Sequence, residues 1–323
     1  MINIILSSYN GEKYITEQIE SILDSDYQDF RLFVFDDAST DNTITLVKKF
    51  EDEYPDKVFL VRNSVNKGST GNFLSGLKFA ARTAPADYYA FCDQDDVWLE
   101  NRLSLCLENM KSLEEEYTSY MPLMLFTDAV LVDSELNSLG TTFFKADRLN
   151  TDKLGFARIL TENRCIGCTS FMNAALVNMI EGYDKRIRYH DWWAALIASA
   201  FGELEYVDVP TVLYRQHSDN VVGQKSFTGY VKDRFNEMSE NNTVSQDCVN
   251  HKNEIKTRIR KTIAQASAFH KMYGDDLLGK NKVILREFIA LGWADPVERR
   301  RLMLKNGFYK SGLLRNIGLF INI

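Results

Sequence analysis

Short apolar runs alternate with amphipathic stretches along the N-terminal third of this chain. The runs, which are typical of buried strands, cover residues 2–6, 31–35, 58–61 and 88–92. Between them, apolar side chains recur at helical spacing over residues 12–23, 40–50 and 69–80. Strands that alternate with helices in this way pair in parallel through right-handed crossovers. The pattern therefore predicts an α/β fold with a mostly parallel central sheet.

Polar residues follow three of these predicted strands. They occupy positions 7–11 after the first strand, 36–39 after the second and 93–96 after the fourth. The carboxyl ends of parallel strands meet at one edge of the sheet, and ligands bind beyond that edge. We therefore expect Tyr9, Asp37 and the acidic residues after the fourth strand to converge on one ligand.

The acidic cluster after the fourth strand reads Asp93-Gln94-Asp95-Asp96. Residues i and i+2 of an extended backbone point the same way, so Asp93 and Asp95 can face one point. Two neighbouring carboxylates repel each other unless a cation lies between them. A divalent cation such as Mg²⁺ typically takes one or two protein carboxylates together with substrate phosphates. The alternative is an acidic turn that caps a helix predicted over residues 99–116.

The regular alternation of predicted strands and helices ends after this cluster. Strands are predicted at 123–127, 129–132, 139–144, 168–172, 205–207 and 211–214, and short helices at 154–160 and 174–180. The stretch from His190 to Ala198 is apolar on every face, which predicts a buried helix. Its first turn holds Asp191 in a fixed place, and His217 follows the last strand.

The composition shifts from about residue 226, where charges rise and strand patterns vanish. Helices are predicted at 231–238, 255–273, 282–290 and 297–305, with a loop at 241–243. We therefore expect a catalytic domain over residues 1–225 and a helical region over 226–323. The tail, residues 307–323, combines apolar and basic residues as helices in a membrane interface do. The alternative is a helix that packs on its own protein.

Composition narrows the classes of function. The 323 residues carry a net charge of −7, which argues against general nucleic-acid binding. No apolar run approaches the roughly 20 residues of a membrane-spanning helix, and the chain enters a strand at once, without a signal peptide. Neither GxGxxG after the first strand nor GxxxxGK[ST] occurs, so bound phosphates need another partner, which again favours a metal.

The five cysteines favour reduced thiols in a cytosolic protein, because their number is odd and two lie in apolar strand or helix patterns. One pair forms Cys165-Ile-Gly-Cys168, a spacing that also occurs in zinc and redox sites. No second CxxC and no pair of histidines completes four zinc ligands, and burial of both thiols is the alternative.

The polar clusters suit a bound nucleoside diphosphate. The Asp37 carboxylate can accept the N3–H of uracil or thymine, and Tyr9 can stack on the same ring. Alternatively, Asp36 or Asp37 caps the helix that follows them. The diphosphate would reach Asp93 and Asp95 through the metal, which offsets charge on the leaving group. His217 is a further metal ligand, a phosphate donor or a structural residue, and Arg215 forms a salt bridge or a phosphate contact.

Asp191 suits a general base that removes the proton of an incoming hydroxyl as it attacks the anomeric carbon of a sugar. A helix N-terminus favours the ionised carboxylate, whereas burial beside Trp192 and Trp193 favours the protonated form. The alternative is an Asp that only caps its helix. One base and one metal suit a single displacement that inverts the sugar carbon.

These residues resemble the inverting family 2 glycosyltransferases, which have the GT-A fold, a Rossmann-like fold for nucleotide-diphospho-sugars. The matching pieces cover about residues 1–220 in order; they are Ser8-Tyr9-Asn10-Gly11, Asp36-Asp37-Ala38-Ser39-Thr40-Asp41, Asp93-Gln94-Asp95-Asp96-Val97-Trp98-Leu99 and His190-Asp191-Trp192. In that family the first two pieces hold the nucleotide and the third binds the metal and the diphosphate. An Asp placed like Asp191 is the base, and many members have Glu where this chain has His190.

The resemblance implies a role for each matched residue. The expected nucleotide-binding residues are Ser8, Tyr9, Asn10, Glu12 and Asp37. Asp93 and Asp95, with His217, are expected to hold Mn²⁺ or Mg²⁺, and Asp191 is the expected catalytic base. Further contacts with substrate or phosphate are expected from Asp96, Trp98, His190, Trp192 and Arg215.

The finer resemblance is to bacterial rhamnosyltransferases that build cell-wall or capsular polysaccharides. It is based on residues 8–14, 93–98, 190–193 and 213–217. It implies a thymidine-diphosphate L-rhamnose donor, a lipid-linked or saccharide acceptor, and a cytoplasmic protein at the inner face of the membrane. The alternatives are the same fold with another UDP- or dTDP-sugar, such as glucose, galactose or N-acetylglucosamine, and a non-catalytic scaffold that binds nucleotide sugar or polysaccharide.

Overall fold

The computed structural model describes residues 1–217 and 246–323, except for the side chains of residues 246–252. Several sequence predictions fall outside the described residues. They are the helix at 231–238, the loop at 241–243 and the domain boundary at 225.

The N-terminal half of the sheet has the predicted parallel pairing. Its strands are β1 (Ile2–Ser8), β2 (Phe30–Asp36), β3 (Val58–Arg62) and β4 (Tyr88–Cys92), and they lie in the order β3-β2-β1-β4. The helices between them are α1 (Ile15–Leu23), α2 (Thr43–Glu53) and α3 (Gly68–Thr83). Every pairing among these four strands is parallel. The loops after β1, β2 and β4 therefore open at one edge, as the apolar pattern predicted.

The second half of the sheet is mixed. Its elements are β5 (Val97–Trp98), α4 (Arg102–Tyr117), β6 (Leu123–Val132), β7 (Ser138–Thr142), α5 (Phe143–Asp147), α6 (Phe156–Thr161), the 3₁₀ turn η1 (Gly167–Thr169), β8 (Ser170–Asn173), α7 (Ala174–Met179), α8 (His190–Phe201) and β9 (Glu203–Arg215). The strand order continues β8-β6-β9-β5, and β7 pairs with β6. Because β4 and β6 both pair antiparallel with β8, and β9 runs parallel to β6, the strands β6 and β9 share the direction of β1–β4.

Two pairs of predicted strands are single strands in the structure. Residues 123–127 and 129–132 form β6, and residues 205–207 and 211–214 form β9. The register between them shifts at Asp128, opposite Pro210. A polar residue and a proline interrupt the apolar pattern, but a bulge absorbs both without ending the ladder. The two-residue strand β5 was not predicted, because it is shorter than any periodic signal.

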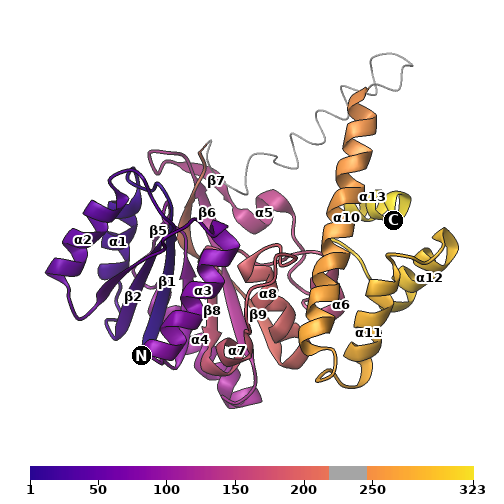
Figure 1. The fold of residues 1–323 in the computed structure, drawn as a ribbon, viewed down its shortest axis with the longest axis horizontal. Helices are drawn as coiled ribbons and strands as arrows, with labels where there is room; N and C mark the ends of the chain where they lie inside the picture. The colour runs from indigo at the N-terminus through magenta and orange to yellow at the C-terminus, as the bar shows by residue number, and fades with distance from the viewer. Residues whose placement is uncertain (218–245) are drawn as a thin grey trace.

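The described C-terminal helices pack beside this sheet domain (Figure 1). They are α10 (Gln246–Tyr273), α11 (Gly279–Ala290), α12 (Pro296–Asn306) and α13 (Leu313–Asn322). The ring of Phe269 on α10 lies 5.4 Å from that of Trp193 on α8 and 5.6 Å from that of Phe156 on α6. The apolar core is therefore continuous from the sheet into these helices. None of the described helices is both long and apolar enough to cross a lipid bilayer.

The buried helix α8 ends at a glycine that has no room for a side chain. Gly202 follows α8, and a Cβ there would lie 1.9 Å from the carbonyl oxygen of Pro122. That oxygen accepts a hydrogen bond from the backbone N–H of Glu203 at 3.1 Å, beside the first pair between β9 and β6. The missing Cβ therefore allows α8 to turn directly into the sheet.

We predict that Gly202→Ala lowers the free energy of unfolding by more than about 2 kcal/mol, because a backbone carbonyl cannot move aside as a flexible side chain does. Urea unfolding of the full chain measures this difference. Gly182→Ala is the matched control, since a Cβ at position 182 meets nothing within 4 Å. Equal unfolding midpoints for the two variants would contradict the prediction.

Candidate functional site

Gln94 fastens the loop after β1 to the loop after β4. Its side-chain Oε1 accepts the backbone N–H of Tyr9 at 2.8 Å, and its Nε2 donates to the carbonyl of Tyr9 at 3.1 Å. A Cβ on Gly11 would lie 2.3 Å from this Oε1, so the glycine makes room for the amide. The Tyr9 side chain itself is 48% exposed and lies outside the core. The structure thus presents an aromatic face beside the acidic cluster.

Asn10 and Glu12 connect the loop after β1 to the start of α2. The backbone N–H of Asn10 donates to Ser39 Oγ at 2.9 Å, and its Oδ1 accepts the backbone N–H of Thr40 at 2.9 Å. Glu12 Oε2 accepts both the backbone and the side-chain N–H of Asn42. Both residues were predicted to contact nucleotide, and in this structure their polar groups hold two loops together.

Asp37 is a buried carboxylate with several partners. Its backbone N–H donates to the carbonyl of Ser8 at 2.8 Å. Its carboxylate accepts Asn63 Nδ2 at 2.8 Å and the backbone N–H groups of Lys67 and Gly68 at 2.9 Å each. One of the two aspartates was expected to cap the next helix, α2. Asp37 instead satisfies N–H groups at the start of α3, because the chain returns beside β2 after β3.

Asp36 and Asp41 accept backbone N–H groups at the end of β2 and at the start of α2. Asp36 Oδ2 accepts the backbone N–H of Ser39 at 3.0 Å. Asp41 Oδ1 accepts the backbone N–H of Thr43, the first residue of α2, at 3.0 Å. Asp41, rather than Asp36 or Asp37, thus bonds the first N–H of α2.

The carboxylates at the end of β4 lie in an electrostatically unfavourable position. Burial, followed by the negative charges of Asp95 and Asp191, raises the pKa of Asp93 to about 8. Burial and the charges of Asp95 and Asp93 also raise the pKa of Asp96 well above its usual value. Hydrogen bonds from the Arg215 N–H and the Cys168 thiol oppose that rise. A cation placed here would remove the repulsion.

Two groups of metal-binding atoms lie at this loop. Asp93, Asp96 and Cys168 each place one ligand atom within 4.8 Å of the others. His217 Nε2 lies 2.9 Å from Asp95 Oδ2. The predicted ligands Asp95 and His217 thus meet, and Asp93 belongs to the same loop. Cys168 and Cys165 are both buried, which was the alternative to a role for the CxxC pair.

Arg215 holds the acidic loop from the end of β9. Its guanidinium donates to the carbonyl of Asp95 at 2.8 Å and forms an ion pair with Glu17. Its backbone N–H donates to Asp96 Oδ1 at 3.1 Å. The side chain is 2% exposed and lies over the ring of Tyr14. Of the two roles predicted for Arg215, the structure contains the salt bridge.

The contact with substrate that was predicted for Trp98 is not what the structure shows. The Trp98 side chain is 3% exposed, and the guanidinium of Arg102 lies 4.3 Å from its ring. It belongs to the hydrophobic core beneath the loop, because β5 pairs with β9 and directs this side chain inward.

Asp191 lies in the first turn of α8, in the position predicted from the sequence. Its Oδ2 accepts Asn163 Nδ2 at 2.9 Å, and its Oδ1 accepts the backbone N–H of Trp192 at 2.7 Å. Burial raises its pKa to about 6, and these two hydrogen bonds oppose the rise. Burial therefore outweighs these hydrogen bonds in setting the pKa of Asp191. Asn163 was not predicted, because no sequence pattern marks it.

His190 is packed into the core rather than presented to a ligand. Its ring stacks on Phe73 with centroids 3.8 Å apart and meets the edge of Phe91 at 4.6 Å. A Cβ on Gly167 would lie 2.7 Å from His190 Nε2, so the glycine fits against the ring. Burial lowers the pKa of His190 to about 3. This packing fixes the start of α8, and the substrate contact expected of His190 stays a prediction.

Trp192 has one face in the core and another at a cavity. Its Nε1 donates to the carbonyl of Ile159 at 2.6 Å, and its side chain lines a cavity beside Asp191. Trp192 was expected to contact substrate, and it borders open space next to the predicted base.

Residues 3–152 match the protein family described as "Glycosyl transferase family 2". A "dTDP-rhamnosyl transferase RfbG" of Shigella flexneri is 30% identical over 230 residues, which span 68% of this chain and 73% of that protein. The "UDP-Glc:alpha-D-GlcNAc-diphosphoundecaprenol beta-1,3-glucosyltransferase WfgD" of Escherichia coli is 36% identical over 110 residues. That match spans 34% of this chain and less than half, 41%, of the relative.

A solved structure shares the fold. It is the mannosyltransferase PcManGT from Pyrobaculum calidifontis in complex with GDP-Man and Mn²⁺, with a TM-score of 0.51 and 16% identity. The likeness covers 99% of this chain and 78% of that chain.

The buried His190 predicts a specific loss of stability in acid. In the unfolded chain a histidine gains its proton near pH 6.5, but folded His190 stays neutral until about pH 3. Its neutral state stabilises the fold above pH 6.5, and this contribution is lost as the pH falls toward 3. Below pH 6.5 the free energy of unfolding should therefore decrease by about 1.4 kcal/mol per pH unit more in the wild type than in His190→Phe.

Urea unfolding between pH 7 and pH 5 measures the two slopes. The matched control is His270→Gln, which removes a partly exposed histidine of α10 and should keep the wild-type slope. The raised pKa of Asp191 acts equally in all three proteins and cancels from the comparison. Identical slopes for the wild type and His190→Phe would exclude His190 as a source of acid lability.

Proposed function

This chain belongs to glycosyl transferase family 2, and from that membership we propose that it transfers L-rhamnose from a thymidine-diphosphate donor to a hydroxyl of a lipid-linked or saccharide acceptor. Its fold is the GT-A fold of nucleotide-sugar transferases, and glycosyl transfer in polysaccharide biosynthesis is the activity of the family members it matches. The rhamnosyl donor is supported by the 30% identity with RfbG.

The observation that carries this proposal is the raised pKa of Asp191. A general base works best when its pKa lies near the working pH, and burial raises the pKa of Asp191 to about 6. Asn163 holds one carboxylate oxygen and fixes its direction. The charge of Asp191 also raises the pKa of Asp93, so the base and the acidic loop act on one small volume. In this proposal, Asp191 takes the proton of the acceptor hydroxyl as it attacks the anomeric carbon, which inverts.

The acidic loop fits a hard divalent cation, Mn²⁺ or Mg²⁺. Buried carboxylates with raised pKa values gain most from a positive charge, and oxygen ligands are those that these ions prefer. Asp93, Asp95 and His217 would hold the ion, and a bound cation supplies Lewis-acid stabilisation to the leaving diphosphate. PcManGT, which shares the fold, was solved with Mn²⁺. The proposed role of Arg215 is to keep Asp95 and Asp96 in place through its hydrogen bonds to the loop and its ion pair with Glu17.

The nucleotide would lie against the loops after β1 and β2. The exposed ring of Tyr9 offers a stacking surface for the base. Asp37 already accepts three N–H groups, so reading N3–H with its carboxylate requires a shared oxygen or a shift of the 63–68 loop. Ser8, Asn10 and Glu12 would shape this pocket through the loop rather than through direct contact, in keeping with their observed bonds.

A different donor sugar is the second candidate. WfgD, named as a UDP-Glc-dependent glucosyltransferase, is 36% identical over 110 residues. That stretch is shorter than the match to RfbG, which extends over 230 residues. We therefore place thymidine-diphosphate L-rhamnose first and uridine-diphosphate glucose second.

We also propose that residues 1–225 form the catalytic domain and residues 226–323 a helical region that touches the inner membrane surface. Leu313 and Ile321 of α13 are 75% and 66% exposed, whereas Leu319 of the same helix is buried at 5%. The helix thus packs on its own protein with one face and leaves a second apolar face in solvent. Such an amphipathic helix suits a membrane interface.

A donor panel tests the proposed function. With Mn²⁺ present, hydrolysis of thymidine-diphosphate L-rhamnose should exceed that of uridine-diphosphate glucose, galactose and N-acetylglucosamine by at least about tenfold, a difference of about 1.4 kcal/mol in transition-state binding. Asp95→Ala should fold normally and lose hydrolysis of every donor. A preference for another sugar would replace the rhamnosyl assignment, and full activity of Asp95→Ala would remove Asp95 from the metal site.

Asp191→Asn tests the base. It should lower the rate of transfer by about 10²–10⁴-fold, the usual contribution of a positioned base, and leave the donor dissociation constant unchanged. The wild-type rate should rise with pH through about 6, since only the ionised carboxylate accepts a proton, and the variant should lose this rise. Asp208→Asn, which changes an exposed carboxylate of β9, is the control. Loss of donor binding in Asp191→Asn would show that Asp191 is not simply a base.

A further inference from the structure

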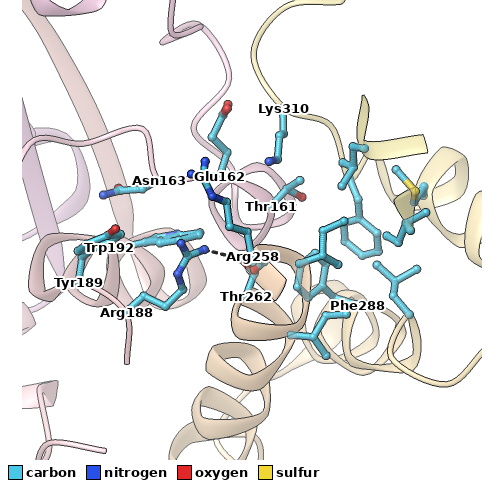
Figure 2. A pocket seen from close by; sticks show the side chains of 17 residues that line it. Thr161, Glu162, Asn163, Arg188, Tyr189, Trp192, Arg258, Thr262, Phe288 and Lys310 are labelled. Atoms are coloured by element: carbon cyan, nitrogen blue, oxygen red, sulfur yellow. Dashed lines mark hydrogen bonds between the residues drawn. The ribbon is translucent and has the colours of Figure 1, made fainter. Parts of the chain in front are cut away.

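A cavity of about 210 Å³ lies between the sheet domain and the C-terminal helices (Figure 2). Its walls come from the segment after α6, the start of α8, α10, α11 and the tail around α13. Pockets that hold a whole small ligand usually measure roughly 300–1,000 Å³. This cavity therefore suits one part of a larger molecule.

Three basic side chains line one side of the cavity. Arg188 reaches it from the segment before α8, Arg258 from α10 and Lys310 from the segment between α12 and α13 (Figure 2). Arg188 donates to Thr262 Oγ1 at 2.7 Å. Within the described part of the chain, the side chains of Arg258 and Lys310 have no hydrogen bond or ion pair. Three cations from three elements thus face one small space.

Among the described residues that line the cavity, Glu162 is the acidic one, and its carboxylate is occupied elsewhere. Its Oε2 accepts the backbone N–H and the hydroxyl of Ser311 at 2.6 and 2.7 Å. Its other oxygen pairs with Arg315 at 3.3 Å. Burial lowers the pKa of Lys310, and the charges of Arg315, Arg188 and Arg258 lower it further, against the opposing effect of Glu162. The positive charge is therefore only partly compensated, and an anion bound there would relieve the repulsion.

The opposite side of the cavity is apolar. It is formed by side chains of α10, α11, α12 and the tail, among them Ile263, Phe288, Leu291, Phe308 and Leu319. A free inorganic anion gains nothing from such a wall, whereas a hydrocarbon gains from leaving water. The two sides together suit an amphiphile with an anionic head.

The cavity is lined by two residues that contact or adjoin the predicted base, Asp191. Asn163 lines it and also donates to Asp191 at 2.9 Å, and Trp192, the residue after Asp191, lines it as well. We propose that this cavity is a subsite for the phosphate and the adjoining hydrocarbon of a phosphate-linked amphiphilic acceptor. This inference rests on the proposed function, and it assigns the C-terminal helices a direct part in acceptor binding. The donor site at the acidic loop and this subsite would then lie on either side of Asp191.

Calorimetric titration of the full chain with geranyl phosphate, geraniol and inorganic phosphate tests the proposal. Geranyl phosphate should bind at least about tenfold more tightly than either part alone. Lys310→Gln and Arg258→Gln should each weaken its binding by about tenfold or more, as expected for the loss of a charge-assisted contact. The matched controls are Lys280→Gln and Arg260→Gln, both exposed on helices of the same region, and they should bind as the wild type does.

Equal affinity for inorganic phosphate and geranyl phosphate would overturn the proposal, and so would equal binding by the Lys310 and Lys280 variants. Arg258 is exposed at the mouth of the cavity, so its variant keeps the test valid if Lys310→Gln fails to fold. Donor hydrolysis by Lys280→Gln should match the wild type, since this exposed residue lies outside both the cavity and the acidic loop. A wild type without donor hydrolysis would overturn the proposed function, whereas lost selectivity for geranyl phosphate would overturn the subsite alone.

Discussion

Repulsion among buried carboxylates is the constraint around which this protein is built. Asp93, Asp96 and Asp191 are largely withdrawn from water, and burial raises the pKa of each. A fold that only needed stability would place apolar residues there, because an uncompensated buried charge is costly. The arrangement is consistent with a cation and a proton that arrive with the substrates. The repulsion thus favours binding of the proposed metal, whereas burial raises the pKa of Asp191.

Several hydrogen bonds hold the acidic loop and Asp191 in place against this repulsion. Arg215 binds the acidic loop through the carbonyl of Asp95 and through its own backbone N–H to Asp96, so its guanidinium fixes the loop without neutralising the charges that a metal needs. Gln94 ties the same loop to Tyr9, and Asn163 holds Asp191 from the other side. Each of these hydrogen bonds to the loop or to Asp191 uses a neutral group or a backbone atom. The loop therefore keeps its shape while its carboxyl groups stay available to a cation, which a direct Arg–Asp pair would not permit.

The sequence was sufficient to predict the strands β1–β4, their parallel pairing and the position of Asp191, but not the hydrogen bonds that hold these elements in place. Apolar runs located β1–β4 because parallel strands buried on both faces are continuously apolar. The position of Asp191 could be predicted because it lies in the first turn of α8, a helix that is apolar on every face. In contrast, the bonds of Asp37 to Lys67 and Gly68 depend on where the chain returns after β3, which no local pattern encodes. Trp98 and His190 were assigned to substrate by motif, yet a two-residue strand and an aromatic stack bury them.

The charges on the two sides of Asp191 give a physical reason for the C-terminal helices. In the proposed function, the acidic loop would attract a cation and the diphosphate bound to it, while Arg188, Arg258 and Lys310 would attract an anion. A donor diphosphate drawn toward these basic residues would be misplaced. Asp191 is linked to both regions, because its charge acts on Asp93 and its partner Asn163 lines the cavity. Two regions of opposite charge at separate places can therefore sort two phosphate-bearing substrates. The C-terminal region supplies two of the three cations, so without it the protein would retain a donor site but lack this means of orienting an acceptor toward the base.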